Sequence, residues 1–164
     1  MVKNNEAQVK KDLANRKITV TRHFDADPEN VWEMWTRPEL IDRWWAPKPW
    51  RAETRSLDFQ PGGKWIYSMV GPNNERHFAM VEYTKIDHLK TFEGTDAFSD
   101  EQGNKSVDLP QSNWKVQFKK DGDGTLVTTT VSAAEPGTLE KLLDMGFEQG
   151  FVMALDNLEE ELNK

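Results

Sequence analysis

Apolar and polar side chains alternate along most of the middle of the chain. Side chains of a β-strand point to opposite faces in turn, so an alternating stretch predicts a strand with one buried face. The first such stretch begins at Lys17, where Ile18 and Val20 alternate with Thr19 and Thr21. The predicted strands are residues 17–24, 52–59, 64–70, 76–85, 89–94, 113–119 and 125–132.

Two short helices are predicted after the first strand. Asp27 is a suitable N-cap, and Pro28 fits the first helical position because proline has no backbone N–H to leave unpaired there. Pro38 breaks this helix and begins the next one. We expect the second helix to carry Trp44 and Trp45, mainly as structural residues, and to close one mouth of any internal cavity.

A long helix is predicted at the C-terminal end, from Pro136 to Asn163. Its apolar residues recur every three or four positions, which is the spacing of one helix face. Gly146 and Gly150 lie one turn apart inside it, where each costs about 1 kcal/mol relative to alanine. We therefore expect a strand, a partner or a ligand to approach closely there. The apolar stripe consists of Leu143, Phe147, Phe151, Leu155, Leu158 and Leu162.

This order of elements predicts an α+β fold, in which a curved antiparallel sheet of six to seven strands wraps around the C-terminal helix. A groove between sheet and helix would follow from the curvature. Residues 1–16 are polar and carry both charge signs, so we expect a disordered or loosely helical tail before the domain. The polar connection from Thr95 to Gln111 is longer than an ordinary hairpin loop and is expected to form a lid.

One strand carries a wall of large side chains. Trp65, Tyr67 and Met69 follow a Pro-Gly-Gly turn and are spaced two apart, so they share one face. That face meets either a packed core or a ligand cavity, and the pattern alone does not separate the two.

The register of the next hairpin decides which titratable side chain joins this wall. If Val70 pairs with His77, then Phe78, Met80 and Glu82 lie on the same face as the wall. Glu82 would then be a hydrogen-bonded carboxylate, a residue at the rim or a general base. A slip of one residue would instead place His77 on that face, and otherwise His77 is an edge or surface histidine.

The composition excludes several kinds of site. The 164 residues include no cysteine, which excludes disulfides, zinc–thiolate sites and a cysteine nucleophile. The three histidines show no metal-binding spacing, so neither a metal nor another cofactor is predicted. A net charge of -7 disfavours nucleic-acid binding. No apolar run suits a membrane span, and the N-terminus lacks the apolar centre of a signal peptide, so we expect a cytoplasmic protein.

Four motifs, taken in order, resemble one family. They lie in residues 28–47, 61–65, 96–103 and 145–150, and include Arg43-Trp44-Trp45 and Pro61-Gly62-Gly63-Lys64-Trp65. Over residues 17–163 the chain is similar to the START-like (SRPBCC, helix-grip, birch-pollen-allergen-like) superfamily. More narrowly, it resembles the branch related to the C-terminal domain of the heat-shock ATPase activator (AHSA-type). The resemblance implies a helix-grip fold with an internal cavity, and a single START-like domain over residues 17–164.

Three functions remain open. The favoured interpretation is that the protein binds a small hydrophobic or aromatic molecule between sheet and C-terminal helix, without catalysis. The second is a cyclase- or hydrolase-type enzyme that uses Glu82, His77 or Tyr67 in the same cavity. The third is a co-chaperone-like interaction module, which is disfavoured because the chain lacks the additional N-terminal domain of the eukaryotic activators. The predicted ligand-binding residues are Trp65, Tyr67, Met69, His77, Phe78, Met80, Glu82, Trp114, Phe147, Gly150 and Phe151.

Overall fold

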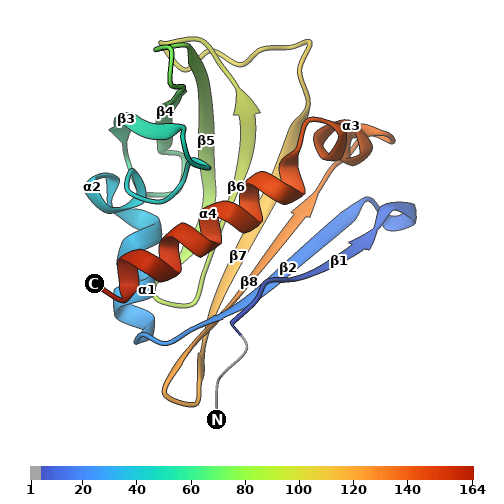
Figure 1. Ribbon diagram of the computed structural model, residues 1–164. Coiled ribbons are helices and arrows are strands. Elements are labelled where there is room, and N and C mark those ends of the chain that lie inside the picture. The colour runs from blue at the N-terminus through green and yellow to red at the C-terminus, as the bar shows by residue number, and fades with distance from the viewer. Residues whose placement is uncertain (1–4) are drawn as a thin grey trace.

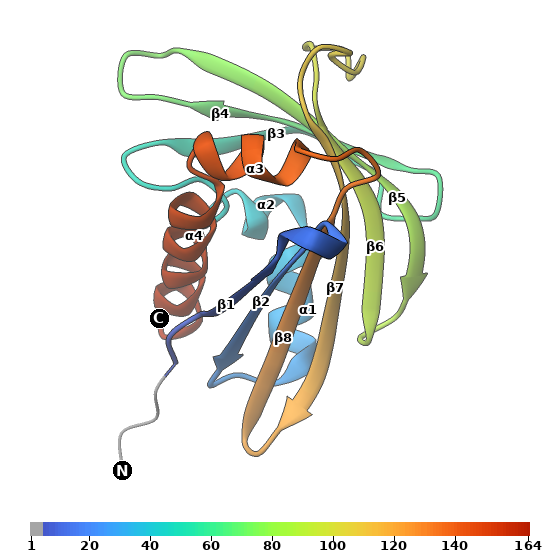
Figure 2. The same ribbon diagram turned by 90° about the vertical axis from the view of Figure 1, so that its right-hand side faces the viewer.

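An eight-stranded antiparallel sheet dominates the computed structural model, which describes residues 5–164 (Figure 1). The strand order is β1-β2-β8-β7-β6-β5-β4-β3, so β3 to β8 form a meander that closes back beside β2. The sheet curves around the C-terminal helices, which confirms the predicted α+β helix-grip fold (Figure 2). The strands are β1 (Gln8–Asp12), β2 (Lys17–Phe24), β3 (Arg51–Leu57), β4 (Lys64–Val70), β5 (Arg76–Asp87), β6 (Thr91–Phe98), β7 (Gln111–Asp121) and β8 (Gly124–Ser132).

The first strand lies in the segment that was expected to be a disordered or loosely helical tail. β1 pairs antiparallel with β2, from Gln8 opposite Thr21 to Asp12 opposite Lys17. A 3-10 turn, Leu13–Asn15, then reverses the chain into β2. The expectation is therefore wrong for residues 8–15, and the sheet gains one strand beyond the six to seven predicted. Residues 1–4 of that tail lie outside the described residues.

Two short helices connect β2 to β3, as predicted. α1 (Pro28–Thr36) and α2 (Pro38–Ile41) both have proline at their first position. The second helix ends at Ile41 and is therefore shorter than expected. Trp44 and Trp45 therefore lie in the turns that follow α2 rather than on a helix face.

The C-terminal helix is broken in two. α3 (Thr138–Asp144) and α4 (Phe147–Leu162) are separated by Gly146, whose φ of 90° lies in the left-handed region that glycine adopts without steric cost. The prediction of one continuous helix is wrong at this point, whereas Gly150 does lie inside α4. α4 runs diagonally across the concave face of the sheet (Figure 1). None of the helices in the described part of the chain is long and apolar enough to cross a membrane.

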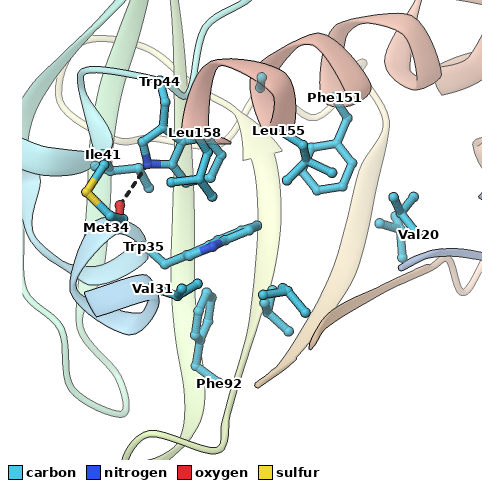
Figure 3. Packing of buried hydrophobic residues seen from close by; sticks show 14 of the residues in the cluster. Val20, Val31, Met34, Trp35, Ile41, Trp44, Phe92, Phe151, Leu155 and Leu158 are labelled. Atoms are coloured by element: carbon cyan, nitrogen blue, oxygen red, sulfur yellow. Dashed lines mark hydrogen bonds between the residues drawn. The ribbon is translucent and has the colours of Figure 1, made fainter. Parts of the chain in front are cut away.

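The core fills the space between α1, the sheet and the C-terminal half of α4. Figure 3 shows Trp35 of α1 lying toward Leu155 and Leu158 of α4, and all three side chains are buried. Trp44 is fully buried, and its Nε1 donates a hydrogen bond to the carbonyl oxygen of Met34 at 2.9 Å. Side chains thus occupy this half of the groove.

Candidate functional site

A cavity of about 510 Å³ lies at the other end of the groove, where α3 meets α4. Strands β4 to β7 form one wall, the α3–α4 junction forms the opposite wall, and the segment after α2 closes a side. Its lining residues are Trp45, Pro47, Trp50, Tyr67, Met69, His77, Phe78, Ala79, Asp96, Ala97, Phe98, Pro110, Trp114, Leu142, Met145, Gly146, Phe147, Gly150 and Phe151.

In the β4–β5 hairpin, the strands are shifted by one residue from the register in which Val70 pairs with His77. Met69 pairs with His77, and Tyr67 pairs with Ala79. The connecting loop comprises residues 71–75, in which Asn74 has a positive φ of 64° and the Gly71 N–H donates to the Glu75 carbonyl at 2.9 Å. Because side chains alternate, this single-residue difference exchanges the two faces of β5. His77 therefore points to the cavity side.

Met80 and Glu82 consequently lie on the outer face of the sheet, and neither lines the cavity. Met80 pairs with Ile66 there, and the Glu82 carboxylate lies 3.7 Å from the Lys105 Nζ. Gly103, in the connection between β6 and β7, packs against the Ile66 side chain on this same face. The connection was expected to be a lid over the cavity. Its middle instead covers the outer face, and Pro110 is its contribution to the cavity lining.

Trp65 supports the cavity wall from behind. It is buried, and its Nε1 donates to the Thr54 hydroxyl at 3.0 Å, which in turn donates to the Asp42 carboxylate at 2.6 Å. Its ring stacks on that of Tyr67 with centroids 4.1 Å apart. The expectation that Trp65 itself would line the cavity is therefore wrong, because Tyr67 stands between it and the open space.

Trp45 takes the central place in the aromatic lining, although the sequence had suggested a structural role for it. Its ring centroid lies 6.3 Å from that of Tyr67, 5.9 Å from Trp114 and 6.2 Å from Phe151. The buried amide of Asn157, on α4, donates to the carbonyl of Ala46 at 3.2 Å and so holds this segment in place. The Trp45 Nε1 is buried and has no hydrogen-bond partner within the described residues.

Asp96 is the carboxylic acid of the cavity. It lies on β6 opposite Val81, which pairs with Trp65 on the concave face. Burial raises the pKa of Asp96 to about 7, and the backbone N–H of Ala97 opposes that rise only in part. The side chain keeps some exposure, so a molecule in the cavity can reach it.

The sequence contained a signal for Asp96. The predicted strand ends at Gly94, whereas β6 extends to Phe98, so that Phe92, Gly94, Asp96 and Phe98 alternate onto one face. The prediction places residues from Thr95 onward in a polar connection, and for this reason it does not include Asp96 among the site residues.

Tyr67 and His77 are the other titratable side chains of the lining. Burial, and then the negative charge of Asp96, raise the pKa of Tyr67 well above its usual value, so its hydroxyl stays protonated. The exposed His77 lies at the rim beside Trp50, with ring centroids 5.5 Å apart. Among residues 5–164, no lysine or arginine lines the cavity. Within residues 5–164, no three His, Asp or Glu side chains are grouped so that they could hold a metal ion.

Most of the predicted ligand-binding residues meet in this cavity. Those that line it are Tyr67, Met69, His77, Phe78, Trp114, Phe147, Gly150 and Phe151. Those that do not are Trp65, Met80 and Glu82. The lining residues that sequence reasoning missed include Trp45, Trp50, Asp96, Leu142 and Met145. Several of these come from turns and helix ends, where periodicity carries no information about direction.

Comparisons with protein families and with solved structures agree with the fold described above. A family model described as "Activator of Hsp90 ATPase homolog 1-like protein" matches residues 25–163. No curated protein matches the chain. The crystal structure of protein Ms6760 from Mycobacterium smegmatis is similar, with 31% identity, a TM-score of 0.87, and coverage of 94% of this chain and 95% of that one.

Two solution structures are also similar. A protein from Arthrobacter aurescens shares 28% identity, with a TM-score of 0.89 and coverage of 95% of this chain and 91% of that one. A protein from Staphylococcus epidermidis shares 26% identity, with a TM-score of 0.83 and coverage of 95% and 93%. These likenesses extend over the sheet and the C-terminal helices that enclose the cavity.

Proposed function

The chain belongs to the family of Activator of Hsp90 ATPase homolog 1-like proteins, and from this premise we propose that it binds a small hydrophobic or aromatic molecule in the cavity between sheet and C-terminal helices. START-like folds commonly bind hydrophobic ligands. The observation that carries the proposal is the cavity itself, whose volume of about 510 Å³ is typical of small-molecule sites. Chaperone binding, which the family description alone suggests, is not part of the proposal.

The lining matches an apolar ligand with few polar groups. Trp45, Tyr67, Trp114 and Phe151 present aromatic surface to the open space, and Asp96 adds a single carboxyl group. Burial of apolar surface contributes about 25 cal/mol per Å², so a ligand that buries about 250 Å² gains roughly 6 kcal/mol before the entropic cost of binding. Micromolar affinity corresponds to about 8 kcal/mol, so polar or electrostatic contacts must add to this apolar contribution.

The cavity can be blocked from α4 without disturbing the core. A Cβ at Gly150 would meet only the Pro47 side chain, at 3.8 Å, so Gly150→Leu places its side chain in the open space. Gln149 is exposed on the same helix, and Gln149→Leu adds the same side chain to the solvent face as a matched control.

The test is a fluorescence titration with N-phenyl-1-naphthylamine, a neutral apolar probe. The proposal predicts saturable binding with one site per chain, loss of binding in Gly150→Leu, and unchanged binding in Gln149→Leu. Absence of saturable binding to the wild type, or equal binding by Gly150→Leu, would contradict it.

One observation favours a second candidate, an acid–base enzyme that uses the same cavity. A carboxyl group with a pKa of about 7 can both accept and donate a proton near neutral pH, and the protonated Tyr67 hydroxyl is close enough for its pKa to respond to the charge of Asp96. Incubation with a pool of small metabolites, followed by mass spectrometry, tests this function. Turnover by wild type that Asp96→Asn abolishes would support it, whereas an unchanged pool, or turnover that survives Asp96→Asn, would contradict it.

A further inference from the structure

We propose that the ligand of this cavity carries a cationic nitrogen, a protonated amine or a quaternary ammonium group, which the Asp96 carboxylate holds against the surrounding aromatic rings. This inference rests on the proposed function, because it names the chemical class of the molecule that the cavity binds.

The only formal charge that the described residues place in the cavity lining is negative. In the described part of the chain, Asp96 on β6 is the only carboxylic acid that lines the cavity, and neither lysine nor arginine lines it. Tyr67 on β4 stays neutral, and His77 on β5 lies exposed at the rim. The lining residues of β7, α3, α4 and the segment after α2 have no titratable side chain. An anionic ligand would thus meet a carboxylate without a compensating cation.

Asp96 has no charged partner among the described residues, and only the backbone N–H of Ala97 stabilises its ionised form. Within residues 5–164 its carboxylate forms no ion pair and accepts no hydrogen bond from another side chain. A desolvated carboxylate without a counter-charge is costly, and a ligand cation would lower that cost. Other buried charges in this protein do have partners, as the ion pairs of Arg22 with Asp156 and Glu159 show.

The rings around Asp96 suit the same kind of group. Trp45, Tyr67, Trp114 and Phe151 all line the cavity, and the ring of Trp45 lies within 6.3 Å of the other three. The face of an aromatic ring attracts a cation within about 6 Å, and tryptophan attracts it most strongly. A carboxylate beside several such faces is complementary to an alkylammonium head and to the apolar body attached to it.

The test compares two molecules of the same shape. Benzyltrimethylammonium and neopentylbenzene differ by one nitrogen in place of carbon, and thus by one positive charge. Both are measured by competition with N-phenyl-1-naphthylamine at pH 8. We expect the cation to bind at least about tenfold more tightly than its neutral isostere in wild type, and this preference to vanish in Asp96→Asn. Glu82→Gln, which removes a carboxylate from the outer face of the neighbouring strand, should leave the preference intact.

The pH dependence supplies a second readout on the unmodified protein. The quaternary ammonium does not titrate, so any change reports the protein. With a pKa of about 7, Asp96 is about one-tenth ionised at pH 6 and about nine-tenths ionised at pH 8, which predicts an affinity increase of about tenfold over this range. His77→Gln should keep this slope, whereas Asp96→Asn should remove it.

The possible results of these experiments distinguish the cationic ligand from the proposed function on which it rests. Equal binding of the two isosteres by wild type would overturn the cationic ligand and leave the apolar cavity standing. Cation affinity that falls or stays constant as the pH rises would also overturn it, because ionised Asp96 would then not be attracting the cation. Failure of both compounds and of the fluorescent probe would overturn the proposed function itself.

Discussion

The rings of Trp65 and Tyr67 stack with centroids 4.1 Å apart and planes inclined by 21°, yet only Tyr67 faces the cavity. The two residues lie on the same face of β4. Trp65 belongs to the filled half of the groove, where its indole N–H is bonded to Thr54. The boundary between core and cavity therefore runs through this stacked pair, and the wall that they form faces both.

The first prediction concerns Asp96 and stability. Its pKa in the folded protein, about 7, lies above the ordinary value of 3.8, so the folded state binds this proton more tightly than the unfolded chain does. The associated stability is fully present below about pH 4 and is lost as the pH rises through about 7. The penalty at high pH is at most about 4 kcal/mol, and the residual exposure of the side chain makes it smaller.

Asp96→Asn lacks this penalty at every pH. We therefore expect the variant to gain stability relative to wild type, by up to about 2–3 kcal/mol, between pH 5 and pH 8. Urea unfolding of both proteins at the two pH values measures the change, and other carboxylates cancel in the comparison. A difference between the two proteins that is independent of pH would show that Asp96 titrates normally in the folded state.

The second prediction contrasts two glycines that bracket the start of α4. Gly150→Ala should stabilise the protein by up to about 1 kcal/mol, because alanine favours a helix and its Cβ meets only Pro47 at 3.8 Å. Gly146→Ala should destabilise it by about 1–2 kcal/mol, because the φ of 90° is strained for a residue with a Cβ. Thermal unfolding of the two variants measures both signs. A stabilising Gly146→Ala would indicate that α3 and α4 can form one helix.

The third prediction concerns the ion pairs that fix α4 to β2. Arg22 is 3% exposed and lies 2.6 Å from the Asp156 carboxylate and 2.9 Å from that of Glu159, whose side chains are 59% and 29% exposed. Replacing both acids by their amides leaves a buried cation without a counter-charge, and should cost at least about 3 kcal/mol. Arg22→Met leaves two carboxylates that water can reach, and should cost less than about 2 kcal/mol.

Chemical denaturation of the amide double variant and of Arg22→Met tests this asymmetry. Equal losses would contradict the asymmetry, because the buried guanidinium would then depend on the pairing no more than the carboxylates do.

The fold could be predicted because its signals are local and repeated. β2 and β4 were predicted with the bounds that they have in the structure, since turn residues and strict alternation mark both ends. The break at Gly146 could not be predicted in this way. Leu143, Phe147 and Phe151 keep helical spacing across it, and one backbone angle decides whether the helix continues.

The candidate site was harder to predict, because it depends on the register. A five-residue turn from Gly71 to Glu75 decides whether His77 or Glu82 faces the cavity, and turn length is not encoded in the strand pattern. Asp96 lies two residues beyond the last predicted strand position on its face. The contribution of Trp45 depends on how the segment after α2 folds back, which hydrogen bonding to Asn157 fixes over a long sequence separation.

The tryptophans give the most direct measurement of whether the cavity binds a ligand. Of the seven tryptophans, Trp45, Trp50 and Trp114 line the cavity, and the remaining four do not. In ¹H–¹⁵N NMR spectra recorded during titration with N-phenyl-1-naphthylamine, we predict saturable shifts that are largest for the indole N–H signals of these three. In Gly150→Leu the same signals should not respond to the probe. The absence of saturable shifts, or shifts that are largest for the tryptophans of the core, would contradict a ligand-binding cavity at this site.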